Sequence, residues 1–73
     1  MTRHNEQYAE VFPRSGRWIV RFTSEPLRSE VRSLFGTDEI ISAFSTAMSF
    51  AEVAAALRAI PANAGTAFVE AGQ

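Results

Sequence analysis

The chain has 73 residues, 47% of them hydrophobic, and a formal net charge of −1, which predicts one small domain spanning 1–73. It contains no cysteine and one histidine, so disulfides and thiolate metal sites are excluded and we expect neither a metal nor a cofactor. Its apolar runs are shorter than the roughly 20 residues of a membrane span, and no apolar segment follows the basic start, so we expect a cytoplasmic protein without membrane contact.

The first ordered element is a β-hairpin. Residues 1–6 are polar and patternless, which is typical of a disordered tail. Two runs rich in β-branched and aromatic residues follow at 7–12 and 17–23, and the turn-forming segment Pro13–Gly16 separates them. This arrangement predicts two antiparallel strands joined by a four-residue loop.

Such a loop sets the hairpin register, with Phe12 opposite Arg17 and Tyr8 opposite Arg21. Because side chains alternate between the two faces of a strand, the hairpin then has one apolar and one mixed face. The apolar face, which we assign to the core, carries Ala9, Val11, Trp18, Val20 and Phe22. The outer face of the hairpin carries Tyr8, Glu10, Phe12, Arg17, Ile19 and Arg21, with Arg14 in the adjoining loop.

The middle of the chain is less clearly patterned. In 26–35 the apolar residues have the i, i+4, i+7, i+8 spacing of a short amphipathic helix, and a strand over 30–35 is the alternative. The segment 37–47 fits a helix or a strand equally well, and its structure is left open.

The clearest element is the helix predicted at 49–60. Ser49 and Glu52 form a capping box, in which each side chain bonds the backbone N–H of the other residue. Pro61 ends the helix, and 66–71 has the composition of a last strand. An apolar stripe is predicted to pack on the core face of the hairpin; it consists of Phe50, Val53, Ala54, Leu57 and Ile60.

Together these elements predict an α+β fold. The hairpin and a C-terminal strand form a sheet, the 49–60 helix covers one of its faces, and 26–35 adds a second short helix or strand. A second stripe of the main helix consists of Ala51, Ala55 and Ala59. Alanine is the best helix former, so this stripe has an ordinary explanation; the alternative is a smooth flank on which a second copy packs as a homodimer.

Catalytic groups are scarce in this sequence. The only imidazole, His4, lies in the predicted tail, and there is no lysine for a Schiff base. Asp38 and Glu39 are adjacent, so their side chains diverge on a helix or a strand alike. We therefore expect a protein that is not an enzyme.

The candidate site is the outer face of the hairpin together with Arg14. One interpretation is a solvated surface held by cross-strand cation–π contacts and ion pairs. A second is a protein-binding surface, because aromatic residues and arginine are enriched at interface hot spots. A third is a nucleic-acid-binding ribbon using Arg14, Arg17 and Arg21, against which stand the central Glu10 and an isoelectric point near 5.7.

The functional expectation is a small non-catalytic module that binds another protein. Its size, its lack of catalytic groups and its Tyr/Phe/Arg face resemble in general type the small inhibitors encoded by phages and plasmids, such as anti-CRISPR and anti-restriction proteins. That resemblance implies an inhibitor that acts by occupying a partner's surface. The alternative is a dimeric nucleic-acid-binding or regulatory protein.

Overall fold

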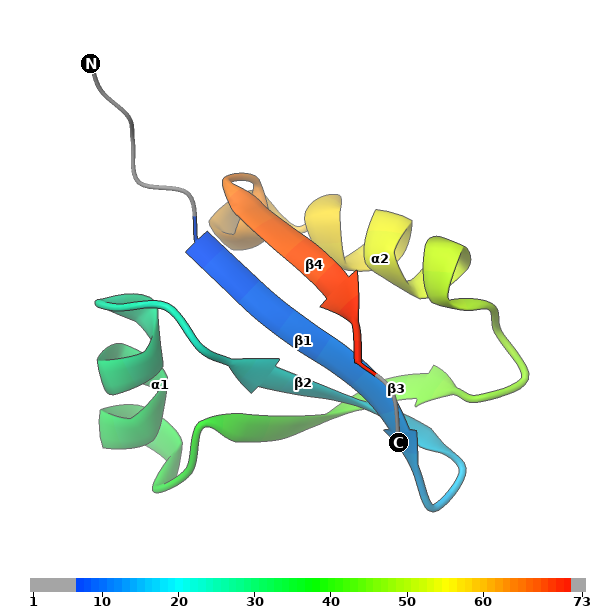
Figure 1. Ribbon diagram of the computed structural model, residues 1–73, viewed down its shortest axis with the longest axis horizontal. Coiled ribbons are helices and arrows are strands. Elements are labelled where there is room, and N and C mark those ends of the chain that lie inside the picture. Colours follow the sequence, from blue (N-terminus) through cyan, green and yellow to red (C-terminus); the bar gives the residue numbers. More distant parts are fainter. Residues whose placement is uncertain (1–6, 72–73) are drawn as a thin grey trace.

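The computed structural model describes residues 7–71, which form a four-stranded mixed sheet and two helices (Figure 1). The elements in chain order are β1 (Gln7–Arg14), β2 (Arg17–Phe22), α1 (Leu27–Phe35), β3 (Glu39–Ser45), α2 (Phe50–Arg58), a 3₁₀ turn (Pro61–Asn63) and β4 (Thr66–Glu70). The strand order is β3-β2-β1-β4, in which β4 is parallel to β1 and the other pairs are antiparallel. The predicted α+β class is confirmed; the predicted tail at 1–6 lies outside the described residues.

The β1–β2 hairpin turns on two residues, Ser15 and Gly16, instead of the four predicted. Their φ angles of 54° and 81° are those of a type I′ turn, whose twist matches that of paired strands. Phe12 therefore pairs with Ile19, and the predicted pairing with Arg17 is wrong. Since the error is two residues, every side chain stays on its predicted face.

Pro13 lies inside β1 even though it lacks a backbone N–H. It pairs with Trp18 in a position where the nitrogen points away from β2, toward the β4 side of the strand. The pairing of β4 with β1 ends at Val11, whose carbonyl accepts from the N–H of Ala71 at 3.0 Å. Pro13 therefore interrupts no ladder hydrogen bond.

The middle segment forms a helix and then a strand. Helix α1 confirms the helical interpretation of 26–35, and it ends at Gly36, whose left-handed φ of 78° lets its N–H donate to the carbonyl of Arg32 at 2.8 Å. The segment 37–47, for which the sequence did not decide between helix and strand, contains the edge strand β3, which pairs with β2. Its register shifts between Ile19 and Arg17 of β2, so β3 bulges there.

Helix α2 begins as predicted. The Ser49 hydroxyl oxygen accepts from the Glu52 N–H at 3.2 Å, and the Glu52 carboxylate accepts from the Ser49 N–H at 2.9 Å. The helix ends at Arg58, two residues before the predicted end. Ile60 therefore lies beyond the helix and is 46% exposed, although it was predicted to complete the core stripe.

The core lies on the side of the sheet that carries both helices. Trp18 is buried there as predicted, with its ring 6.4 Å from that of Phe50 and its indole N–H donating to the Met48 carbonyl at 3.0 Å. Buried residues of β1, β2, β4, α1 and α2 join it in one cluster. Neither described helix has the length and apolarity to cross a membrane.

A group of charged side chains fastens α1 to the start of β3. Arg28 pairs with Asp38 at 3.1 Å and with Glu25 at 3.3 Å, and the Ser29 hydroxyl donates to Glu25 at 2.6 Å. The Arg28 hydrogen bond holds the pKa of Asp38 below its ordinary value, and the Ser29 hydroxyl does the same for the pKa of Glu25. The Asp38 carboxylate in turn raises the pKa of Arg28.

Candidate functional site

The face of the sheet away from the helices brings all seven candidate residues together. The register and the alternation of the strands place Tyr8, Glu10, Phe12, Arg14, Arg17, Ile19 and Arg21 on this face. The same register adds Glu39 and Ile41 from β3 and Val69 from β4. We call these ten residues the outer sheet face.

The outer sheet face is organised in rows that run across the strands. A charged row contains Glu10, Arg21 and Glu39. An apolar row beside it contains Phe12, Ile19 and Ile41. An arginine row next to the hairpin turn contains Arg14 and Arg17, with Ser45 of β3 beside them. Charges of opposite sign thus alternate in one row, and two like charges face each other in another.

Glu39 links the charged row to the arginine row. Its carboxylate pairs with Arg14 at 2.9 Å and with Arg21 at 3.4 Å, while Arg21 also pairs with Glu10 at 2.9 Å. The Arg14–Glu39 pair joins β1 to β3 and must therefore cross over β2, which lies between them. Two arginines and two glutamates are consequently held in one network.

This network covers the Phe12 part of the apolar row. The guanidinium carbons of Arg14 and Arg21 lie 5.1 and 4.7 Å from the centre of the Phe12 ring, in cation–π contact. Phe12 and Ile19 are each only 1% exposed, although no helix packs on this side and neither belongs to the main core cluster. The sequence suggested that both would be open to a partner; instead they form a small second core beneath the charges.

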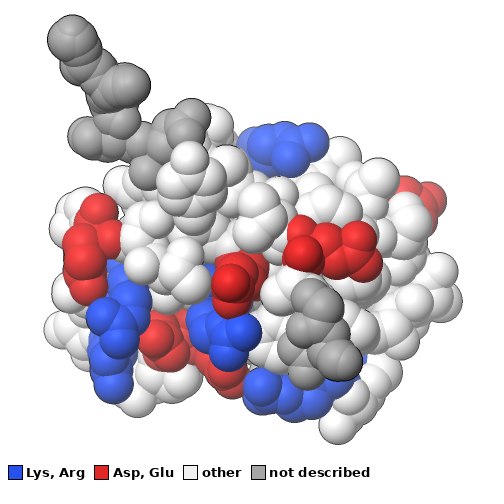
Figure 2. All heavy atoms as spheres, in the orientation of Figure 1, with Lys and Arg blue, Asp and Glu red and all other residues white. Residues whose placement is uncertain are grey.

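The accessible part of the outer sheet face is apolar at its two edges and basic at the hairpin turn. Ile41 on the edge strand β3 is 72% exposed, and Tyr8 and Val69 are exposed on the β4 side. Arg17 donates to the Ala43 carbonyl at 3.3 Å and makes no ion pair within residues 7–71. Figure 2 shows positive and negative side chains interleaved over the strands, with positive ones where Figure 1 places the hairpin turn.

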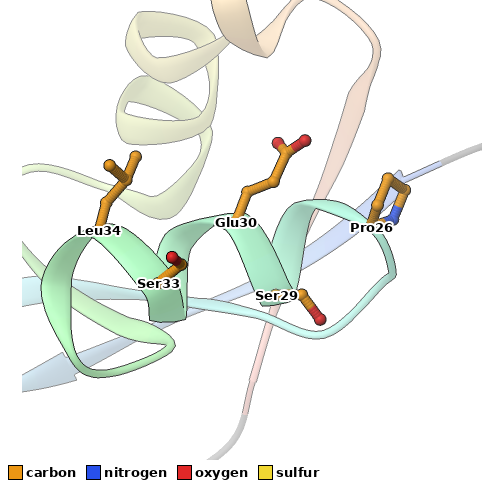
Figure 3. A pocket seen from close by; sticks show the side chains of 5 residues that line it. All are labelled: Pro26, Ser29, Glu30, Ser33 and Leu34. Carbon is orange, nitrogen blue, oxygen red and sulfur yellow. The ribbon is translucent and has the colours of Figure 1, made fainter.

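The outer sheet face offers charged groups and apolar side chains. The described part of the chain has no group of three histidine, cysteine, aspartate or glutamate side chains placed to hold a metal. A hollow of about 500 Å³ lies elsewhere, as a shallow depression on α1 between Pro26 and Leu34 (Figure 3). Glu30 is its one charged lining residue, beside the hydroxyl groups of Ser29 and Ser33.

Sequence reasoning missed Glu39, Ile41 and Val69. Glu39 and Ile41 lie in the segment left open, and their alternation with Ile40 fits a strand once one is assumed. Nothing in the local sequence indicates that this strand lies beside β2, which is what brings Glu39 within reach of Arg21. The partner of the predicted C-terminal strand was likewise unassigned, so the position of Val69 could not be derived.

The alanine stripe of α2 faces solvent on the other side of the molecule. Ala51, Ala55 and Ala59 are all exposed. Their use as a dimer flank remains a prediction.

Comparison with protein-family models, with curated proteins and with solved structures finds no match for the chain. The site is therefore interpreted from its own geometry.

Proposed function

We propose that the chain is a non-catalytic protein-binding domain that covers part of a partner's surface with its outer sheet face. The observation that carries this proposal is a wide sheet face left open by both helices, on which an interlocked charge network lies between exposed apolar edges. The inhibitor class suggested by size and composition stays a prediction.

The charge network supports binding because it is ordered before a partner arrives. Ordering rotamer-rich side chains at an interface costs about 0.5–1.5 kcal/mol for each one immobilised. Arg14 and Arg21 are already held by Glu39, Glu10 and the Phe12 ring. Binding of a partner to this face therefore costs less side-chain conformational entropy.

The exposed groups define the chemistry of the partner. Arg17 offers at the hairpin turn a guanidinium that makes no ion pair with residues 7–71, which suits a carboxylate on the partner. Ile41 and Val69 suit apolar side chains on either side of the charged centre. The expected partner is a protein surface with an acidic residue flanked by apolar ones.

Nucleic acid fits this face less well. The outer sheet face has three guanidiniums against two carboxylates, and Glu10 and Glu39 lie in its charged row. Phosphate binding uses unpaired cations, but two of the three arginines are already neutralised by glutamates. The exposed Tyr8 could stack on a base, but the charges around it do not favour a phosphate backbone.

Site-specific photo-cross-linking in the cell that carries the gene tests the proposal. A photoreactive phenylalanine analogue replaces Ile41 on the outer sheet face or, as the control, Ala55 on the exposed side of α2. We expect one protein of discrete mass linked through position 41 and not through position 55, and lost when Arg17→Gln is added. Linkage through position 55 alone, linkage to nucleic acid, or no linkage at either position contradicts the proposal.

A further inference from the structure

The helix side of the sheet carries apolar residues that the described part of the chain, 7–71, leaves partly uncovered. In α1, Leu27, Val31, Leu34 and Phe35 share one side of the helix by their spacing. Val31 is buried, but Leu34 is 78% and Phe35 62% exposed, so the last turn of the stripe has no cover. Ile60, just past α2, is exposed as well.

An open cavity of about 400 Å³ lies between the end of α2 and the strands on this same side. Its apolar lining includes Phe22, Ile40, Phe44, Leu57, Ile60 and Phe68. Its polar side chains are Ser42, whose hydroxyl oxygen accepts from the Phe44 N–H at 3.1 Å, and Asn63, whose amide donates to the Leu57 carbonyl at 3.2 Å. No charged residue lines it, so it favours an apolar occupant.

The open cavity is large enough to receive side chains of a partner. An apolar cavity of about 150 Å³ holds a benzene molecule, so about 400 Å³ has room for two apolar side chains. Two such side chains, Leu34 and Phe35, stand exposed at the end of α1.

We propose that the occupant is a second copy of this chain, in a two-fold dimer in which Leu34 and Phe35 of each copy enter the cavity of the other. An interface of this kind is reciprocal, so the dimer fills both cavities and covers both apolar stripes at once. It uses the helix side of the sheet and is independent of the outer sheet face. It also differs from a seam along the alanine stripe.

The charges beside the two surfaces are complementary. Glu30 lies one turn before Leu34 on α1, and Figure 3 shows the two side chains projecting from the same side of the helix. Arg58 is an exposed residue in the last turn of α2, at the end of the helix where Leu57 and the following Ile60 line the cavity. Neither Glu30 nor Arg58 makes an ion pair with any described residue. Inserting α1 into the partner's cavity brings these opposite charges toward each other.

Sedimentation velocity of the full chain, from about 5 to about 500 µM, tests the dimer. We expect a species of twice the 8.0 kDa of one chain. The double variant Leu34→Ser, Phe35→Ser should weaken the dimer at least about tenfold, as loss of a hot spot does. Its fold should persist because both side chains are exposed in the monomer, which circular dichroism checks. Ile41→Ser, which removes an equally exposed side chain from the outer sheet face, should change the dimer affinity less than about twofold.

Disulfide cross-linking tests the proposed contact between α1 of one copy and the cavity of the other. The chain has no cysteine of its own, so only the introduced cysteines can form a disulfide. Protein carrying Phe35→Cys is mixed with protein carrying Ile60→Cys, at a partly exposed residue that lines the cavity, and oxidised. We expect a two-chain product from this mixture and little from Ile41→Cys or Ala55→Cys protein treated alone. A wild-type chain that stays monomeric at the highest concentration overturns the proposal, as does preferential linkage through position 41 or 55.

Discussion

Phe12 shows how a residue on the solvent side of a sheet can behave as core. Its ring is covered by two guanidiniums instead of by a helix, and the arginines are held in place by Glu39 and Glu10. Burial of an aromatic ring and two cation–π contacts therefore depend on the same few charges. The alternating sequence pattern predicted the face of Phe12 correctly, but its burial depends on a glutamate 27 positions further along the chain.

Replacing Phe12 by leucine tests this second core. Leucine keeps most of the apolar volume but loses both cation–π contacts, so we expect the free energy of unfolding to fall by about 1–2 kcal/mol. Urea denaturation followed by Trp18 fluorescence measures the change. A variant as stable as the wild type would mean that Phe12 is not covered as described.

Replacing Glu39 by glutamine tests the network that covers Phe12. Arg14 and Arg21 lose their shared carboxylate, and we expect a loss of about 0.5–1 kcal/mol that shrinks in 1 M salt, where charge interactions are screened. Glu70→Gln is the control, since Glu70 is exposed and makes no ion pair within residues 7–71. Equal losses in the two variants would show that Glu39 has no special role.

At the scale of the elements, the sequence predicted best where local chemistry decides the structure. The capping box of Ser49 and Glu52 set the start of α2 because both hydrogen bonds are local. The hairpin register was wrong because a serine with positive φ, Ser15, takes a turn position that the pattern assigned to a longer loop. Strand β3 could not be predicted, since an apolar run of this length suits either element until a neighbouring strand is known.

Ser49→Ala should remove the N-terminal cap of α2. We expect the free energy of unfolding to fall by about 1 kcal/mol, because the Glu52 N–H loses its acceptor. Ser33→Ala, at an exposed position inside α1, should change it by less than about 0.5 kcal/mol. Thermal unfolding of both variants gives the comparison, and a larger loss for Ser33→Ala would contradict the cap.

Acid should loosen the attachment of α1 to β3. The pKa values of Glu25 and Asp38 are lower in the folded protein than in the unfolded chain, so folding is favoured by their ionised forms. This stabilisation is complete above their ordinary values of 4.5 and 3.8 and is lost as the pH falls below them. The Asp38→Asn variant should therefore lose less stability than the wild type between pH 5 and pH 2.5 in denaturant titrations. An identical pH dependence of the two proteins would contradict this role.

At the scale of the molecule, the α+β class and the two faces of the hairpin could be derived from the sequence, but the sheet order could not. The faces follow from alternation, which survives a register error of two residues. The order β3-β2-β1-β4 depends on contacts between distant segments, and it decides that Glu39 joins the outer sheet face. The cavity on the helix side could not be predicted either, since Ile60 and Leu34 fit their apolar stripes but remain exposed among the described residues.

The helices thus leave two surfaces with different chemistry. The outer sheet face is charged at its centre and apolar at its edges, whereas the helix side has an apolar cavity and two exposed apolar side chains. We assign partner binding to the first and self-association to the second. The two assignments can be tested independently. Ile41 and Arg17 belong only to the outer sheet face, and Leu34 and Phe35 belong only to the helix side.

The most direct test of partner binding by the outer sheet face is a calorimetric titration. The partner identified by cross-linking is purified and titrated with each of two matched arginine variants of this chain. Arg17 lies on the outer sheet face and Arg32 on α1; both are exposed, and neither forms an ion pair with a described residue. We expect Arg17→Gln to weaken binding at least about tenfold, as loss of a hot-spot arginine does, and Arg32→Gln to leave it within about twofold. Unchanged binding by Arg17→Gln together with a loss for Arg32→Gln would contradict the assignment of the outer sheet face.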